Sequence, residues 1–152
     1  MTSPLIDALT EDHGMPVVSA ETLDAFAERV PVAVLFFSGD PDRLWEANDV
    51  AVVLPELKKA LGDGAEFCVI DRASERELQL RYRFNAFPTL VFLANGQYLG
   101  AISRMQDWAD YLEQIAEILA RKPSEPPAFV FPEGCGVTAQ ANSAAATNGA
   151  AR

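Results

Sequence analysis

The sequence predicts an α/β fold in which helices flank a central mixed β-sheet. Two short segments, residues 32–37 and 67–70, are apolar throughout and rich in β-branched and aromatic side chains, which is typical of strands buried on both faces. Amphipathic helical patterns separate the strand-like segments, as expected for βαβ units. Asn95-Gly96 joins two further strand-like segments and predicts an antiparallel hairpin.

The first elements are a short helix, a short strand and a second helix. Apolar spacing over residues 5–9 predicts a helix that ends by Gly14, and residues 15–18 predict a strand. Ser19 is the expected N-cap of the second helix, because its hydroxyl can accept a hydrogen bond from a free N–H of the first turn. The apolar stripe expected on this helix consists of Leu23, Phe26, Ala27 and Val30.

A longer helix is expected over residues 47–61, after the first buried strand and a polar loop at 38–43. Pro55 lies inside this helix and should kink it, because proline removes a backbone hydrogen bond and clashes with the preceding turn. Gly62 is the expected stop signal.

The second half of the pattern completes the sheet. It consists of a strand over 66–71, a helix over 74–81, hairpin strands over 88–93 and 97–103, and a final helix capped by Asp107. The helix over 74–81 is expected to turn Leu78, and in one alternative also Leu80, toward the core. The apolar face expected on the final helix consists of Trp108, Tyr111, Leu112, Ile115, Ile118 and Leu119.

The 152 residues predict one domain over 1–122, followed by a Pro-rich linker and a disordered tail over 123–152. In an alternative, residues 129–131 of the tail dock locally. The N-terminus has no secretory signal pattern, and the longest apolar stretch, 30–37, is too short to span a bilayer. We therefore expect a cytoplasmic protein without direct membrane insertion.

The formal net charge of −10 argues against nucleic acid or an anionic membrane surface as a partner. It favours basic partners, although acidity that serves solubility alone is an equal alternative. The two cysteines, Cys68 and Cys135, form no C-x-x-C pair, and no metal-ligand cluster surrounds His13, the single histidine. The sequence therefore predicts neither a cofactor nor a metal site.

The segment from Tyr82 to Gly96, which contains Phe-Pro-Thr-Leu-Val-Phe and Asn-Gly, resembles thioredoxin, and the order of elements over about 15–120 agrees. This resemblance implies a thioredoxin-like fold with a cis peptide bond at Phe87–Pro88. Pro55 matches the kinking proline of the thioredoxin redox helix, so the family's spacing places the two redox cysteines at Ala47 and Val50.

Two supporting groups are also replaced. Leu35 occupies the position of the buried thioredoxin acid, and Phe67 that of a lysine on the next strand. Thiol exchange needs a low-pKa thiolate beside a resolving thiol. Without these groups, the sequence predicts that the protein is not an enzyme.

A narrower resemblance, over most of residues 1–120, is to the hydrogenase expression/formation proteins called HyaE, HupG or HoxO. It rests on the segments 35–43, 49–57 and 107–111, and on Phe-Pro-Thr-Leu-Val-Phe followed by Gly-Gln-Tyr-Leu-Gly. The resemblance implies a non-redox chaperone in [NiFe] uptake hydrogenase maturation. Its implied partner is the hydrogenase small-subunit precursor with its basic twin-arginine signal peptide, and other hydrogenase maturation proteins are further candidates.

A peptide-binding site is expected where the redox site of a thioredoxin would lie. Carboxylates pair well with guanidinium groups, aromatic faces attract them, and the backbone beside the cis-proline of thioredoxins pairs with extended substrates. The candidate site residues are Asp40, Asp42, Trp45, Glu46, Asp49, Phe87, Pro88 and Thr89. Each also has a simpler interpretation, such as a turn residue, a helix-dipole partner or a cover for the core edge.

Two other functions remain open at this point. One is a monothiol redox protein that uses Cys68 or Cys135, although the apolar strand around Cys68 should raise the pKa of its thiol. The other is a scaffold domain without a peptide site.

Overall fold

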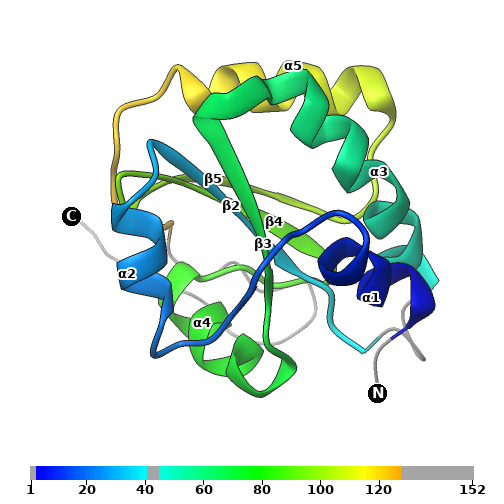
Figure 1. Cartoon of the computed structure of the whole chain (residues 1–152). Coiled ribbons are helices and arrows are strands. Elements are labelled where there is room, and N and C mark those ends of the chain that lie inside the picture. Colours follow the sequence, from blue (N-terminus) through cyan, green and yellow to red (C-terminus); the bar gives the residue numbers. More distant parts are fainter. Residues whose placement is uncertain (1–2, 41–44, 128–152) are drawn as a thin grey trace, which may run out of the picture.

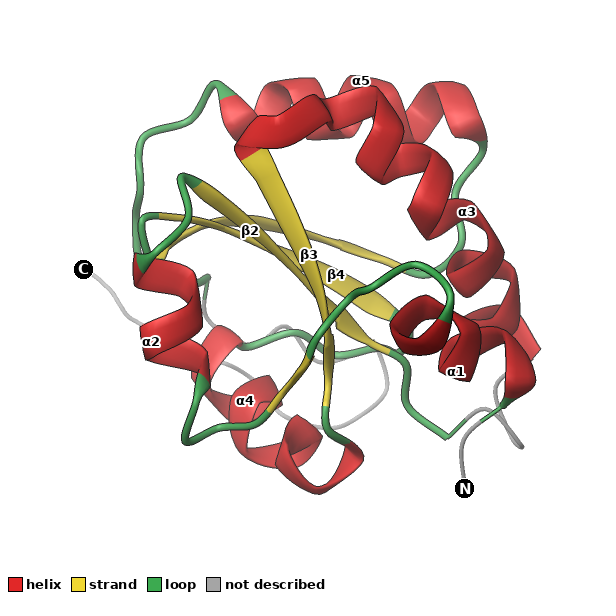
Figure 2. Ribbon diagram, viewed as in Figure 1, coloured by secondary structure: helices red, strands yellow, loops and turns green. Residues whose placement is uncertain are grey.

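The computed structural model describes residues 3–40 and 45–127. Its sheet has five strands: β1 (Val17–Val18), β2 (Val32–Phe37), β3 (Ala65–Ile70), β4 (Thr89–Ala94) and β5 (Gln97–Ser103). They lie in the order β1-β3-β2-β4-β5, in which β1, β3 and β2 are parallel, β4 is antiparallel to β2, and β5 is antiparallel to β4 (Figure 2). The predicted mixed sheet is confirmed.

Helices cover both faces of this sheet (Figure 1). On one face pack α1 (Pro4–Glu11), α3 (Trp45–Leu61) and α5 (Trp108–Leu119), and on the other α2 (Leu23–Glu28) and α4 (Glu75–Tyr82). Short 3₁₀ turns, Gly62–Gly64 and Arg72–Ser74, precede β3 and α4. In the described part of the chain, no helix is both long and apolar enough to cross a membrane.

The central strand β2 separates two apolar cores. Val34 and Phe36 point into the core beneath α1, α3 and α5, whereas Leu35 and Phe37 point into the core beneath α2 and α4. Successive side chains of a strand lie on opposite faces, so a strand with helices on both sides must be apolar at every position. This explains why residues 32–37 could be assigned from sequence.

Three local predictions differ from the structure. Thr22, not Ser19, is the N-cap of α2, because residues 19–22 form a separate turn whose Ser19 carbonyl accepts the N–H groups of Thr22 and Leu23. Leu80 is 54% exposed, since α4 meets the sheet through Leu78 and Tyr82. Of the six apolar residues expected to form one face of α5, three are instead exposed: Trp108, Leu112 and Leu119.

The chain after α5 turns back toward the sheet edge. The Ser124 N–H donates to the Tyr98 carbonyl of β5 (3.0 Å), and the Arg83 guanidinium donates to the Pro126 carbonyl (3.1 Å). The first residues of the predicted linker thus lie against the domain. Residues 128–152, which include Cys135, are outside the described part of the chain.

Candidate partner-binding site

The candidate site lies where β2 ends and β4 begins. The peptide bond between Phe87 and Pro88 is cis, as predicted, and the next residue, Thr89, pairs with Phe37 at the end of β2. The chain leaves β2 through Ser38, Gly39 and Asp40 and reaches α3 at Trp45. The fold therefore brings the loop after β2, the start of α3 and the cis-proline to one end of the sheet.

Arg104 joins two of the predicted site residues. Its backbone N–H donates to the Pro88 carbonyl (2.7 Å), and its guanidinium donates two hydrogen bonds to Glu46 Oε1 (2.6 and 2.8 Å). Glu46 Oε2 accepts the N–H of Met105. These hydrogen bonds, chiefly those from Arg104, lower the pKa of Glu46 below its ordinary value.

The acid predicted to receive a partner's arginine is thus already paired within the protein. Glu46 fixes the start of α3 to the loop between β5 and α5, and Arg104 adopts a left-handed backbone conformation there (φ 70°). Glu46 therefore holds the start of α3 and the loop between β5 and α5 together at this end of the sheet. Arg104 was missed because it lies 58 residues from Glu46, and no local pattern reports such a contact.

Trp45 is 80% exposed at the first position of α3. This exposure argues against the alternative that Trp45 covers the edge of the core. Asp49, one helical turn further on, is also exposed. The second tryptophan of the chain, Trp108, is 45% exposed at the start of α5, four residues after Arg104. Large exposed aromatic side chains are a feature of contact surfaces, where tryptophan contributes much of the binding energy.

The remaining predicted residues differ in accessibility. Phe87 is half-buried, and its ring packs edge-on against Phe84 (5.4 Å between centroids), which in turn packs against Phe37. Thr89 is 1% exposed, its hydroxyl bonds to the Ala86 carbonyl and Ser103 Oγ, and β2 and β5 pair with it on its two sides. An extended partner would therefore reach the backbone at Phe87, while Thr89 supports that edge from inside.

The loop after β2 is anchored by Glu75, a residue that the sequence did not single out. Glu75 is buried at the start of α4, and its carboxylate accepts the N–H of Gly39 (3.1 Å) and pairs with Arg72 (2.9 Å). Burial raises the pKa of Glu75 above its ordinary value. The anchor positions Asp40, which also interacts with other residues; Asp42 lies outside the described residues.

The positions that correspond to the thioredoxin cysteines are buried. Ala47 and Val50 lie on the buried face of α3, and Leu35 is buried in the opposite core. Cys68 is fully buried beside Leu35, and this burial raises the pKa of its thiol well above the ordinary value. A protonated and inaccessible thiol is a poor nucleophile, which disfavours the monothiol alternative for Cys68.

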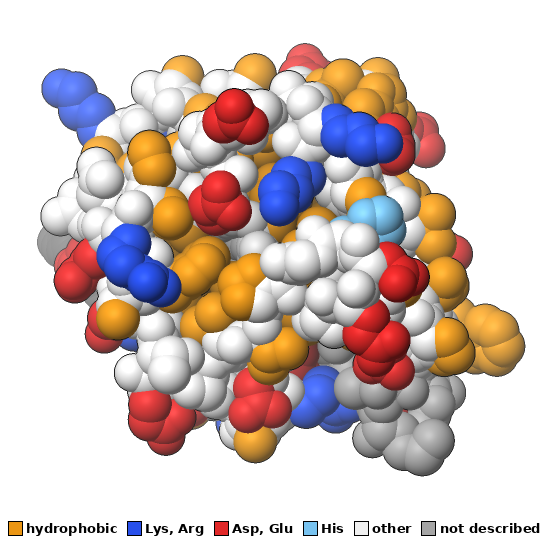
Figure 3. Space-filling model, viewed as in Figure 1, with side chains coloured by type: hydrophobic (Ala, Val, Ile, Leu, Met, Phe, Trp, Pro, Cys, Tyr) orange, Lys and Arg blue, Asp and Glu red, His pale blue; other side chains and the backbone are white. Residues whose placement is uncertain are grey.

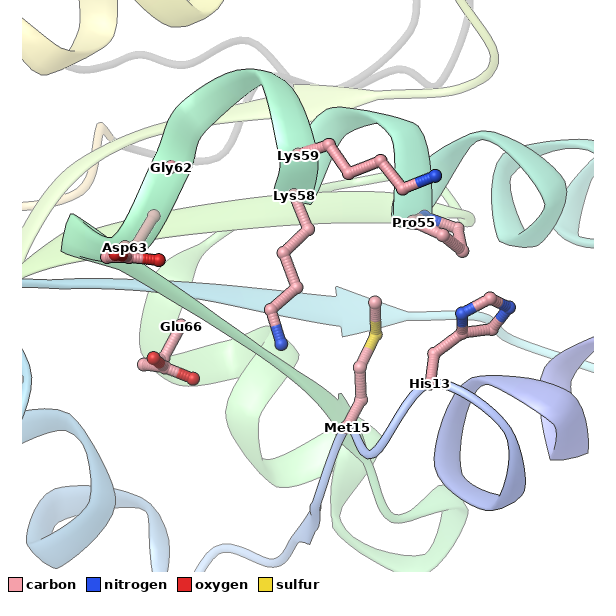
Figure 4. A pocket seen from close by; sticks show the side chains of 9 residues that line it. His13, Met15, Pro55, Lys58, Lys59, Gly62, Asp63 and Glu66 are labelled. Carbon is pink, nitrogen blue, oxygen red and sulfur yellow. The ribbon is translucent and has the colours of Figure 1, made fainter.

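A separate hollow lies at the other end of α3 (Figure 4). His13, Met15 and the end of α3 line it, and Lys58 extends into it between Met15 and Glu66. The lysine Lys59 pairs with Glu56 on the surface of the helix. The hollow includes none of the predicted site residues, and within the described residues no group of three potential metal ligands exists.

On the face seen in Figure 3, acidic and basic side chains are interspersed around an apolar area. The acidity is therefore not a single continuous field on this face.

The chain is similar to several known proteins. A family model described as "Hydrogenase-1 expression protein HyaE" matches residues 5–111. The hydrogenase expression/formation protein HoxO of Azotobacter vinelandii is 49% identical over 127 residues, which cover 84% of this chain and 85% of that protein. The corresponding protein HupG of Bradyrhizobium diazoefficiens is 43% identical over 72% of this chain and 76% of its own length.

Solved structures agree with this relationship. A crystal structure described as a hydrogenase expression/formation protein HupG, from Rhodopseudomonas palustris, has a TM-score of 0.50 and 39% identity, and the match covers 69% of this chain and 95% of that one. A thioredoxin variant from Halobacterium salinarum has a TM-score of 0.56 at 22% identity, covers 81% of this chain and 99% of its own, and supports the fold alone. The domain thus has a thioredoxin-like fold, and the names of its relatives support a role in hydrogenase formation. From the matching family model and these relatives, the chain belongs to the HyaE family of hydrogenase expression/formation proteins.

Proposed function

We propose that this protein is a non-redox chaperone in [NiFe] uptake hydrogenase maturation, which binds the small-subunit precursor and its twin-arginine signal peptide. One observation carries the proposal. The cis-proline end of the sheet, where thioredoxins bind extended segments, is retained together with an exposed Trp45, while the redox positions Ala47 and Val50 are apolar and buried. A peptide-binding surface that lacks the redox cysteines favours recognition of a partner over disulfide exchange.

The residues at this end suit an extended basic segment. The indole of Trp45 offers a face for a guanidinium or an apolar side chain, and the exposed carboxylate of Asp49 lies one turn away. The backbone at Phe87 offers the position where an extended chain would pair. In this proposal, the pair of Glu46 and Arg104 holds the start of α3 against the loop between β5 and α5. Asp40 and Asp49 provide the negative charge of the site.

Binding of purified small-subunit precursor tests the proposal. We expect the precursor to bind, to bind more weakly when its signal segment is deleted, and to bind more weakly when the ionic strength rises from about 0.05 M to about 0.3 M, because salt screens exposed charge pairs. Equal affinity with and without the segment would contradict the signal-peptide part alone. Absence of binding to both forms would contradict the proposal as a whole.

A further inference from the structure

Helix α5 has more apolar surface than its contact with the sheet covers. At about 3.6 residues per turn, its apolar residues lie within an arc of about 180°. The remainder of the circumference carries its polar residues, Asp110, Glu113, Gln114 and Glu117. A helix that packs only on one core needs an apolar stripe of about 100°. Because the buried residues of α5 occupy only about 60° at one side of the arc, much of its apolar surface faces outward.

The outward part of this arc is a continuous strip along the helix, here called the outer face of α5. Trp108, Leu112 and Leu119 lie within about 40° of one another, and they are 45%, 37% and 37% exposed. Ala109 and Ala116 lie beside them and are also exposed. Single exposed apolar side chains are ordinary on a protein surface, whereas an aligned set is typical of a contact with another molecule.

A row of carboxylates borders the outer face. Asp110, Glu113 and Glu117 lie within about 60° of one another on the next side of the helix, and α5 contains no lysine or arginine. Within residues 3–40 and 45–127, none of these three carboxylates forms an ion pair. Arg121, which follows α5, turns to the sheet and donates to the Leu99 carbonyl (3.4 Å). The row is therefore available to a basic group of another molecule.

We propose that the outer face of α5 binds an amphipathic segment of the partner, in which apolar side chains lie beside lysines or arginines. The apolar side chains would pack on Trp108, Leu112 and Leu119, and the cationic groups would meet the carboxylate row. A second copy of the chain fits this surface less well, because its outer face carries the same carboxylates. An anionic lipid surface is disfavoured for the same reason.

The outer face begins at the proposed partner site, so this inference rests on the proposed function and adds a second contact to it. The Arg104 N–H donates to the Pro88 carbonyl (2.7 Å), and the Tyr111 hydroxyl donates to the Arg104 carbonyl (3.3 Å). These bonds tie the first turn of α5 to the cis-proline end. From Trp108 to Leu119 the outer face extends about 16 Å along the helix. A partner bound at the cis-proline would thus have a second, amphipathic segment on α5.

Binding of a free peptide tests the outer face separately from the precursor. The probe is the peptide LKKLLKLLKKLLKL, titrated into the full chain and followed by the NMR shifts of individual amides. We expect the amides of α5 to shift, and a peptide with glutamate at each lysine position to bind at least about tenfold more weakly.

Two pairs of variants locate the contact. L112A/L119A should weaken binding of the lysine peptide by at least about tenfold, because it removes the apolar contact and keeps a good helix former. The matched control L5A/L80A removes two leucines that are more exposed, at 46% and 54%, and should retain wild-type affinity. E113Q/E117Q should also weaken binding, whereas E21Q/E28Q, at exposed positions outside α5, should not. Circular dichroism checks that each variant remains folded.

Several outcomes would overturn the inference. These are no binding of the lysine peptide to the wild type, shifts confined to other elements, wild-type affinity in L112A/L119A, and an equal loss in L5A/L80A. Self-association of the peptide-free chain that L112A/L119A abolishes would make a second copy the occupant instead.

The small-subunit precursor then separates this inference from the proposed function. If the precursor binds, L112A/L119A should weaken that binding as well, and wild-type affinity in this variant would contradict the second contact alone. If the precursor does not bind at all, the proposed function fails, while the peptide titration still decides what the outer face of α5 can bind.

Discussion

At the scale of single residues, Glu46 shows how a predicted ligand can prove to be part of the framework. Its carboxylate is a natural partner for an arginine, and the structure supplies that arginine from within, as Arg104. A charge pair that spans two elements constrains both of them. Glu46 directly follows the exposed Trp45 in the chain, so the pair also holds the part of α3 from which Trp45 projects.

The pair makes a prediction about pH. Because Arg104 lowers the pKa of folded Glu46, the stabilisation is complete above the ordinary glutamate pKa and is lost as the pH falls through the lowered value. Glu46→Gln should reduce the free energy of unfolding by about 1 kcal/mol at neutral pH, and the difference from the wild type should shrink below about pH 4. Denaturant unfolding at several pH values measures both effects.

The exposed Glu117 of α5 provides the control, since Glu117→Gln should leave the unfolding curve unchanged. If Glu46→Gln and the wild type differed equally at every pH, the charge of Glu46 would not be the source of the stabilisation.

Cys68 gives a second prediction at this scale. In a Cys135→Ala variant, Cys68 is the one remaining thiol, and its burial should prevent reaction with a thiol reagent in the native state at neutral pH. Full reaction is expected only in denaturant, as measured by absorbance of the released chromophore. Rapid stoichiometric labelling of the native protein would instead restore Cys68 as a redox candidate.

At the scale of elements, strand and helix identities followed from the sequence because they depend on local periodicity. The buried strands β2 and β3 are apolar on both faces, and Asn95-Gly96 marks the hairpin. Periodicity is weaker at deciding which apolar residues of a helix meet the sheet. The six candidates on α5 lie within an arc of about 120° on the helix surface. The sheet covers only one side of this arc, so Tyr111, Ile115 and Ile118 are buried, whereas Trp108, Leu112 and Leu119 remain at the surface.

The candidate site was only partly predictable for a related reason. The cis-proline could be placed because the resemblance to thioredoxin covers contiguous residues. The two residues that organise the site, Arg104 and Glu75, act on segments 58 and 36 residues away. Such contacts depend on how the elements pack, which a single sequence does not display.

Glu75 leads to a prediction for the loop after β2. Glu75→Ala should cost about 1–3 kcal/mol of unfolding free energy, because the buried N–H of Gly39 loses its acceptor. Glu75→Gln keeps an acceptor oxygen and should cost less. Denaturant unfolding of the two variants tests this order, and an equal loss in both would mean that the charge pair with Arg72, rather than the loop anchor, is the main contribution.

At the scale of the whole molecule, the fold separates stability from recognition. Two cores on opposite faces of one sheet hold the elements together, and the end that carries cis-Pro88 presents exposed aromatic and acidic side chains. Replacement of the redox positions by Ala47 and Val50 extends the core under α3. In the proposed function, a thioredoxin-like domain without the redox cysteines would still offer a surface for another protein.

The most direct test is calorimetric titration of the small-subunit precursor into Trp45→Ala and Leu80→Ala. Both side chains are exposed, at 80% and 54%, but Leu80 lies on α4, a helix that contains none of the predicted site residues. Neither change should lower the unfolding midpoint noticeably. We expect Trp45→Ala to weaken binding by at least about tenfold and Leu80→Ala to retain wild-type affinity. Wild-type affinity in Trp45→Ala, or an equal loss in both variants, would contradict a partner site at the cis-proline end.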